Sequence, residues 1–131
     1  MKALSIRSDY AAEIMNGTKT EEYRTWSTKH RGELLICNTA KKIHGFVPGY
    51  ALCVVRITDI EQREDDEGRY YAWKIAPFTR NGSYWIEPLP IKGRLGLFNV
   101  DDRLIKRAPF TEIHSRNAKE WFERVIAPLR Y

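Results

Sequence analysis

The hydrophobic period of the chain changes at Gly17, and this change limits the possible folds more than any other feature. From Ser8 to Asn16, apolar residues recur at steps of three and four, and Ser8 can cap a helix. From Thr20 to Trp26 the period is two, as in a half-buried strand. The sequence therefore predicts a helix, a tight turn at Gly17 and a strand.

Further strands are predicted downstream from short apolar runs separated by turn residues. The expected ranges are 3–6, 33–38, 51–60, 70–75, 83–86 and 95–100. The acidic run Glu64–Glu67 is interpreted as a solvated loop, and Pro88 and Pro90 exclude a central strand at their positions. From Ser115 onwards, apolar residues at helical steps predict an amphipathic helix. We expect an α+β, mostly β fold: a small barrel or strongly curved sheet with helices at its edge.

The length and composition indicate one cytoplasmic domain. The 131 residues (15.4 kDa) suffice for one core, so we expect a single domain over residues 1–131. No apolar run is long enough to span a membrane, and the short apolar start, which ends at Arg7, does not resemble a signal peptide. Cys37 and Cys53 lie in apolar runs and are expected in the core. The three histidines lack metal-ligand spacing, so neither a metal nor another cofactor is expected.

The net charge of +5 and the pI near 9.3 favour a polyanionic partner without requiring one. Single-stranded nucleic-acid binders alternate cations with aromatic rings that stack on bases. Tyr10 and Trp26 are candidates for stacking, although Trp26 is as well explained by packing, and Tyr23 is expected in the core. The candidate phosphate-binding cations are Lys29, Arg31, Lys41, Lys42, Lys92 and Arg94.

Lys19, Glu22 and Arg24 bring an ammonium, a carboxylate and a guanidinium together directly after the turn. Arginine can bind a phosphate or a base edge with two hydrogen bonds, lysine can supply a cation, and glutamate can accept hydrogen bonds or move a proton. The alternative is that Glu22 and Arg24 neutralise each other on the surface while Lys19 is solvated. Spacing alone favours this surface ion pair.

The same segment resembles the signature of the ASCH family, G-x-K-x-x-E-x-R, at Gly17, Lys19, Glu22 and Arg24. Three flanking segments also resemble the family, and they are 1–6, 24–36 and 90–98. The resemblance implies a PUA-like small β-barrel and a cleft between the first helix and the signature strand. It further implies that Lys19, Glu22 and Arg24 line this cleft, and that single-stranded RNA or a nucleotide is the ligand.

Two departures limit what the resemblance implies. Ser8-Asp9-Tyr10 stands where many members have Q-P-W, and Glu22 replaces the threonine that relatives resembling N4-acetylcytidine amidohydrolases carry as a proposed nucleophile. We therefore expect RNA binding, and we favour RNA phosphodiester hydrolysis over amide hydrolysis if the protein is an enzyme. In that case Lys19, Glu22 and Arg24 would be its catalytic residues. A protein-interaction module that uses Glu64–Glu67 or the C-terminal helix is the remaining alternative.

Overall fold

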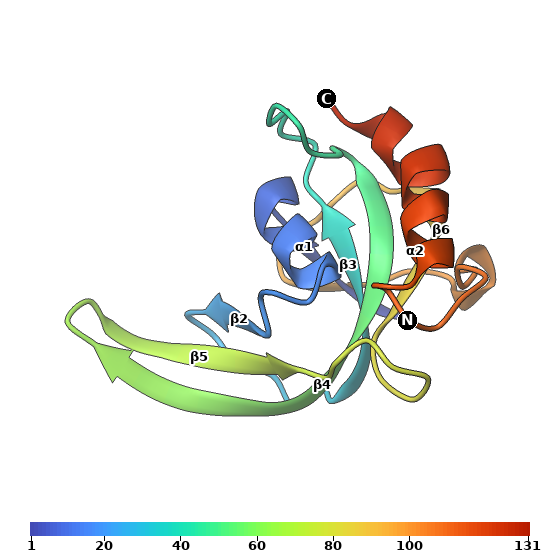
Figure 1. The fold of residues 1–131 in the computed structure, drawn as a ribbon. Coiled ribbons are helices and arrows are strands. Elements are labelled where there is room, and N and C mark those ends of the chain that lie inside the picture. Colours follow the sequence, from blue (N-terminus) through green and yellow to red (C-terminus); the bar gives the residue numbers. More distant parts are fainter.

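The computed structural model describes residues 1–131 (Figure 1). The strands are β1 (Lys2–Ile6), β2 (Glu21–Arg24), β3 (Gly32–Asn38), β4 (Tyr50–Asp65), β5 (Gly68–Ile75), β6 (Tyr84–Pro90) and β7 (Leu97–Asn99). The helices are α1 (Ser8–Met15) and α2 (Arg116–Trp121), and α2 continues into a π-helical turn (Phe122–Ile126). Short 3-10 turns cover Asp102–Leu104 and Ala127–Leu129. The expected α+β, mostly β fold and the expected C-terminal helix are confirmed.

The seven strands form one open sheet in the order β2-β5-β4-β3-β1-β7, with β6 paired to β4. Of the two expected forms, the strongly curved sheet is confirmed and the barrel is not, because the terminal strands β2 and β7 do not pair with each other. The long strand β4 pairs with β3 and β6 in its first half and with β5 in its second, and its register shifts between Ile57 and Asp59. This irregularity bends the strand and changes its direction, so the sheet curves without closing.

The β4–β5 hairpin projects from the body of the molecule (Figure 1). The interpretation of the acidic run as a loop was largely wrong, because Glu64 and Asp65 belong to β4 and pair with β5. Only Asp66 and Glu67 form the turn, which ends at Gly68 with a φ of 122°. The side chains of Glu64–Glu67 and of Arg69 at the outer end of the hairpin are all exposed, so this part of the sequence lacks the apolar alternation that predicts a half-buried strand.

The core lies between the curved sheet and the helices. α1 buries Ser8, Ala11, Ile14 and Met15, and α2 buries Ala118 and Trp121. The ring of Trp85 from β6 stacks on that of Trp121, with centroids 6.3 Å apart, and this contact attaches α2 to the sheet. Among the strands, β6 pairs only with β4, and its other edge forms an isolated bridge from Ile86 to Arg107. Pro88 and Pro90 lie beyond this bridge, where that edge has no further strand partner. None of the helices combines the length and the apolar character that a membrane-spanning segment needs.

Candidate functional site

The turn after α1 is fixed by hydrogen bonds, and these determine where Lys19 lies. Gly17 has a φ of 85°, which strains any residue with a side chain. The Asn16 side-chain oxygen accepts hydrogen bonds from the backbone N–H and the hydroxyl of Thr18, at 2.9 and 2.7 Å. The N–H of Lys19 then donates to the carbonyl of Glu13 at 2.9 Å. The turn therefore delivers Lys19 to the start of β2 in one defined geometry.

Glu22 is a nearly buried carboxylate between two cations. Its side chain is only 10% exposed, on the sheet face that also carries its cross-strand partner Trp73. Arg24 Nη2 lies 3.0 Å from Oε2, and Lys19 Nζ lies 3.6 Å from Oε1. The backbone N–H of Tyr23 also donates to Oε1, at 3.2 Å. Both carboxylate oxygens are thus engaged, and the three side chains together carry one net positive charge.

Arg24 connects β2 to β1 and to the loop before β7. Its Nη2 donates to the carbonyl of Ser5 at 2.9 Å, while the Ser5 hydroxyl accepts from the backbone N–H of Arg94 at 3.1 Å. A Cβ atom at Gly93 would lie 2.5 Å from that hydroxyl, so only glycine allows the loop to approach so closely. The structure therefore brings the loop that carries Lys92 and Arg94 to the residue that holds Arg24. Both side chains are exposed.

Two exposed tyrosines flank Lys19. The Tyr10 and Tyr23 side chains are 45% and 50% exposed, and Lys19 Nζ lies 5.6 and 4.8 Å from their ring centroids. These distances are in the range of cation–π contacts. The expectation that Tyr23 is a core residue was wrong: the face of β2 that turns inwards is the one with Glu22, because the ion pairs compensate its burial.

Neighbouring side chains hold Tyr23 in place. Its hydroxyl donates to Glu21 at 2.9 Å, and its ring meets the edge of the Tyr70 ring at a centroid distance of 5.8 Å. Arg63 of β4 binds Glu21 through two hydrogen bonds of 3.0 and 2.8 Å, and the bonded guanidinium lowers the pKa of Glu21. Sequence reasoning missed Arg63 and Tyr70 because the pairing of β2 with β5 was not foreseen.

Two open hollows adjoin Lys19 and Arg24. One, of about 370 Å³, is lined by Glu13, Thr18, Lys19, Thr20, Glu21 and Tyr23. The other, of about 410 Å³, is lined by Tyr23, Arg24, Thr25, Asp65 and Tyr70. Tyr23 borders both of them, so its ring separates two shallow spaces along β2. Both are open to solvent.

The other predicted RNA-binding residues lie apart from this cluster. The ring of Trp26 packs edge-on against the buried Trp73, with centroids 5.0 Å apart, so part of its surface is already covered. Lys29 and Arg31 lie on the connection to β3, where Arg31 binds the carbonyl of Thr28 at 2.9 Å. Lys41 and Lys42 lie on the loop after β3, and Lys42 Nζ is 5.6 Å from the ring centroid of Tyr131.

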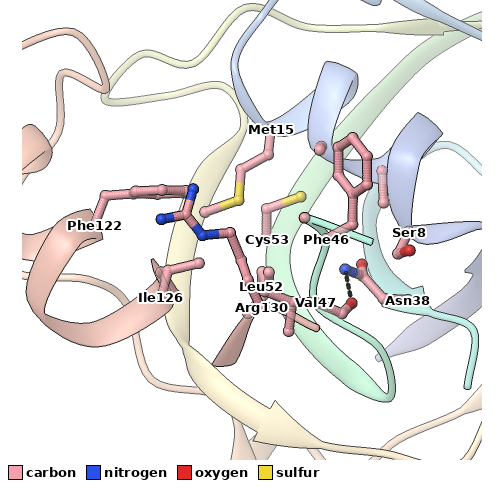
Figure 2. Close-up of a pocket in the computed structure, with 13 residues that line it drawn as sticks. Ser8, Met15, Asn38, Phe46, Val47, Leu52, Cys53, Phe122, Ile126 and Arg130 are labelled. Atoms are coloured by element: carbon pink, nitrogen blue, oxygen red, sulfur yellow. Dashed lines mark hydrogen bonds between the residues drawn. The ribbon is translucent and has the colours of Figure 1, made fainter. Parts of the chain in front are cut away.

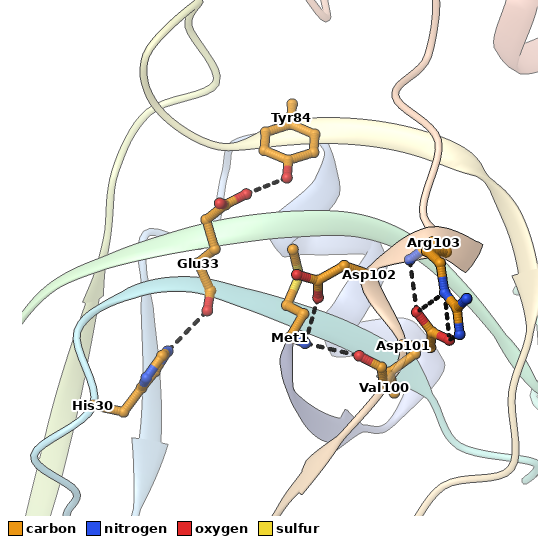
Figure 3. A network of polar contacts seen from close by, with 8 residues as sticks. All are labelled: Met1, His30, Glu33, Tyr84, Val100, Asp101, Asp102 and Arg103. Atoms are coloured by element: carbon orange, nitrogen blue, oxygen red, sulfur yellow. Dashed lines mark hydrogen bonds and ion pairs between the residues drawn. The ribbon is translucent and has the colours of Figure 1, made fainter.

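A second polar network lies around Glu33 of β3 (Figure 3). The Tyr84 hydroxyl donates to the Glu33 carboxylate, and the Arg107 guanidinium lies 3.7 Å from the Tyr84 ring centroid. Burial and the bond to Glu33 raise the pKa of Tyr84 to about 12.

Burial likewise raises the pKa of Cys37 and of Cys53 to about 12. No group of three His, Cys, Asp or Glu side chains is placed to hold a metal ion.

Comparison with known proteins identifies the family. The sequence profile of the ASCH domain matches residues 4–127. This chain belongs to the ASCH domain family. The ASCH domain has a PUA-like fold that is often linked to RNA binding. No protein with a curated description matches this ASCH domain.

Solved structures show the same fold. The crystal structure of ASCH from Zymomonas mobilis superposes on this ASCH domain with a TM-score of 0.58 and 12% sequence identity. The superposition covers 78% of this chain and 88% of that one. A serine-to-alanine mutant of that protein has the same identity and TM-score and covers 77% and 88%. A tyrosine-to-phenylalanine mutant also has the same identity and TM-score and covers 77% and 90%. At this identity the likeness extends to the fold alone.

Proposed function

We propose that this ASCH domain binds single-stranded RNA, or a nucleotide-like part of it, across Lys19 and Arg24. The observation that carries the proposal is the position of the Lys19 ammonium between the exposed rings of Tyr10 and Tyr23. A cation beside aromatic faces is the combination that single-stranded nucleic acids require, because phosphates need charge and unpaired bases need stacking surfaces. The link of the ASCH family to RNA supports this choice among polyanions.

In the proposed complex each side chain has a distinct role. Lys19 and Arg24 contact phosphates, and Tyr10 and Tyr23 stack on bases on either side. The loop with Lys92 and Arg94, which meets Ser5, adds charge at the rim. Glu22 positions the two cations. Both of its oxygens are already engaged, and this favours a positioning role over proton transfer.

Binding is therefore the primary function that we propose, and RNA hydrolysis is a secondary one. Cleavage would require proton transfer near the phosphate, and Lys19 and Glu22 are the candidates for it at this site. Amide hydrolysis of an N4-acetylcytidine-type nucleoside lacks a nucleophile at position 22, and no contact in the structure assigns that role to Thr20.

The test measures RNA affinity by fluorescence anisotropy with a labelled single-stranded oligonucleotide over a range of salt concentrations. The Lys19→Ala/Arg24→Ala double variant is expected to bind much more weakly. Its slope of log K against log[salt] should be shallower by about 1.4, which is the loss of two single-strand phosphate contacts. Lys106→Ala/Arg116→Ala removes the same charge from exposed positions elsewhere and serves as the matched control.

Unchanged binding in the double variant, or equal losses in the two variants, would contradict the assigned site. Gel analysis of the RNA after incubation reports on hydrolysis in the same samples. Intact RNA under conditions of saturated binding would leave binding alone as the function.

A further inference from the structure

A cavity of about 160 Å³ lies between α1, β4 and the C-terminal segment (Figure 2). Helical spacing places Tyr10 on the opposite side of α1 from the residues that line this cavity. Of its thirteen lining residues, nine are hydrophobic, so its interior is apolar. Met15 comes from α1, Leu52 and Cys53 come from β4, and Phe46 comes from the loop between β3 and β4. The exposed Gly45 and Arg130 mark its mouth. None of Lys19, Glu22 and Arg24 lines it, so the cavity is separate from the proposed RNA site.

The wall opposite α1 has unusual geometry. Phe122 and Ile126 line the cavity from the two ends of the π-helical turn, which closes with a hydrogen bond from the N–H of Ala127 to the carbonyl of Phe122. Such turns are rare in helices and frequent at functional sites. Tyr131 then exchanges two hydrogen bonds of 2.8 Å with the loop, one to the N–H of Gly45 and one to the carbonyl of Phe46. The C-terminal segment that lines one side of the cavity is therefore hydrogen-bonded to the loop between β3 and β4 that lines another.

Two polar groups in this cavity lack strong partners. The Ser8 hydroxyl is buried without a hydrogen-bond partner, although Ser8 is only 1% exposed. An unpaired buried hydroxyl costs about 1–3 kcal/mol, which a suitable ligand atom would recover. At the mouth, the Arg130 side chain forms no ion pair, and its one hydrogen bond, from Nε to the carbonyl of Ala127, is long at 3.3 Å. By contrast, the Asn38 amide is engaged, because it donates to the carbonyl of Val47 at 2.8 Å.

We propose that this cavity binds a small aromatic carboxylate that consists of one six-membered ring with a carboxyl group. An apolar cavity of about 150 Å³ admits benzene, so the volume matches one ring and excludes a long acyl chain. The carboxylate pairs with the guanidinium of Arg130, and a ring hydroxyl, where present, pairs with Ser8. A nucleobase is a poor match, because its several polar atoms would meet only two free partners, the Ser8 hydroxyl and the Arg130 guanidinium.

The experiment is isothermal titration calorimetry with benzoate, the hydroxybenzoates, benzyl alcohol and acetate. We expect saturable binding of the aromatic carboxylates, tighter binding of at least one hydroxybenzoate than of benzoate, and no binding of acetate. Arg130→Gln should weaken benzoate binding by about 10- to 100-fold, the usual range for a lost charge-assisted hydrogen bond. Ser8→Ala should remove the preference for the hydroxybenzoate and leave the affinity for benzoate unchanged.

Ala12→Leu tests the location, because Ala12 lines the cavity and a leucine side chain would fill it. We expect it to abolish binding, and a thermal unfolding curve checks that the variant is folded. If the Ala12→Leu variant does not fold, Arg130→Gln still tests the proposal, because residue 130 is exposed and its substitution should not disturb folding. Absence of saturable binding at millimolar carboxylate would overturn the proposal, as would equal affinity for benzyl alcohol and benzoate. The Lys19→Ala/Arg24→Ala variant should bind benzoate normally, so this result is independent of the RNA site.

Discussion

Arg24 Nη2 donates to the backbone carbonyl of Ser5 and to the carboxylate of Glu22, at 2.9 and 3.0 Å. One nitrogen thus ties the end of β2 both to β1 and to its own strand. Its neighbour Nε is buried without a partner. Two hydrogen bonds therefore hold one side of the guanidinium in place, while Nε remains an unused donor. The orientation of the guanidinium should matter as much as its charge for the proposed RNA binding.

Arg24→Lys separates orientation from charge. Lysine keeps the positive charge and loses the planar guanidinium, so we expect RNA affinity to fall by about 10-fold while the salt dependence stays unchanged. Arg24→Gln should also reduce the salt slope, by about 0.7. Salt-dependent anisotropy measures both quantities. Equal slopes for the two variants would contradict a phosphate contact at Arg24.

Tyr10→Ala and Tyr23→Ala test the stacking surfaces. Each should cost about 1–3 kcal/mol of RNA binding free energy, because each removes one ring on which a base can stack. The salt slope should not change, since no charge is lost. Tyr10→Phe and Tyr23→Phe keep the rings and should bind like the wild type. Weak binding by the phenylalanine variants would show that the hydroxyls matter more than the rings.

Glu22→Gln tests the buried carboxylate. The substitution leaves Lys19 and Arg24 close together without an anion, so the free energy of unfolding should fall by about 1–3 kcal/mol. Glu61→Gln is the matched control, because the Glu61 side chain is 47% exposed and also pairs with two cations, Arg63 and Lys74. Exposed pairs contribute about 0–1 kcal/mol. Chemical denaturation measures both variants, and equal effects would contradict a special role for burial.

Tyr84 should titrate later than an ordinary tyrosine. Its pKa is raised from 10.0 to about 12 in the folded protein, so the folded state holds the phenolic proton more tightly than the unfolded state. This contribution to stability is fully present below pH 10 and is lost as the pH rises towards 12. Ultraviolet difference absorbance of the wild type and of Tyr84→Phe isolates this component. A component that titrates with the exposed tyrosines would contradict the burial of the hydroxyl.

The sequence predicted those elements in which one face meets the core and the other meets water. α1 and the strands near it have clear periods, because Ile14 and Met15 are buried while Glu13 is exposed. The outer half of β4 has no such contrast, so its end at Asp65 could not be predicted. Pairing of β2 with β5 is a long-range contact that no local pattern contains.

The candidate site was predicted in part, for a related reason. The signature gave Lys19, Glu22 and Arg24, and the structure brings these three side chains together. The outward orientation of Tyr23 was missed, because hydrophobicity alone places a tyrosine inside and a glutamate outside. The pairing of Glu22 with two cations reverses that preference. The cavity beside Ser8 depends on the docking of the C-terminal segment, which no pattern around α1 indicates.

The projecting hairpin determines the position of one of the two tyrosines that we propose as stacking surfaces. Tyr10 belongs to the body of the domain, whereas Tyr23 lies on β2, whose only partner in the sheet is β5 of the hairpin. Side-chain contacts such as that of Arg24 with Ser5 also join β2 to the body of the domain. Otherwise the distance between the two rings depends on how far the hairpin bends. The two tyrosines that we propose as stacking surfaces therefore lie on separate parts of the fold, and the bend of the hairpin sets the width of the gap between them.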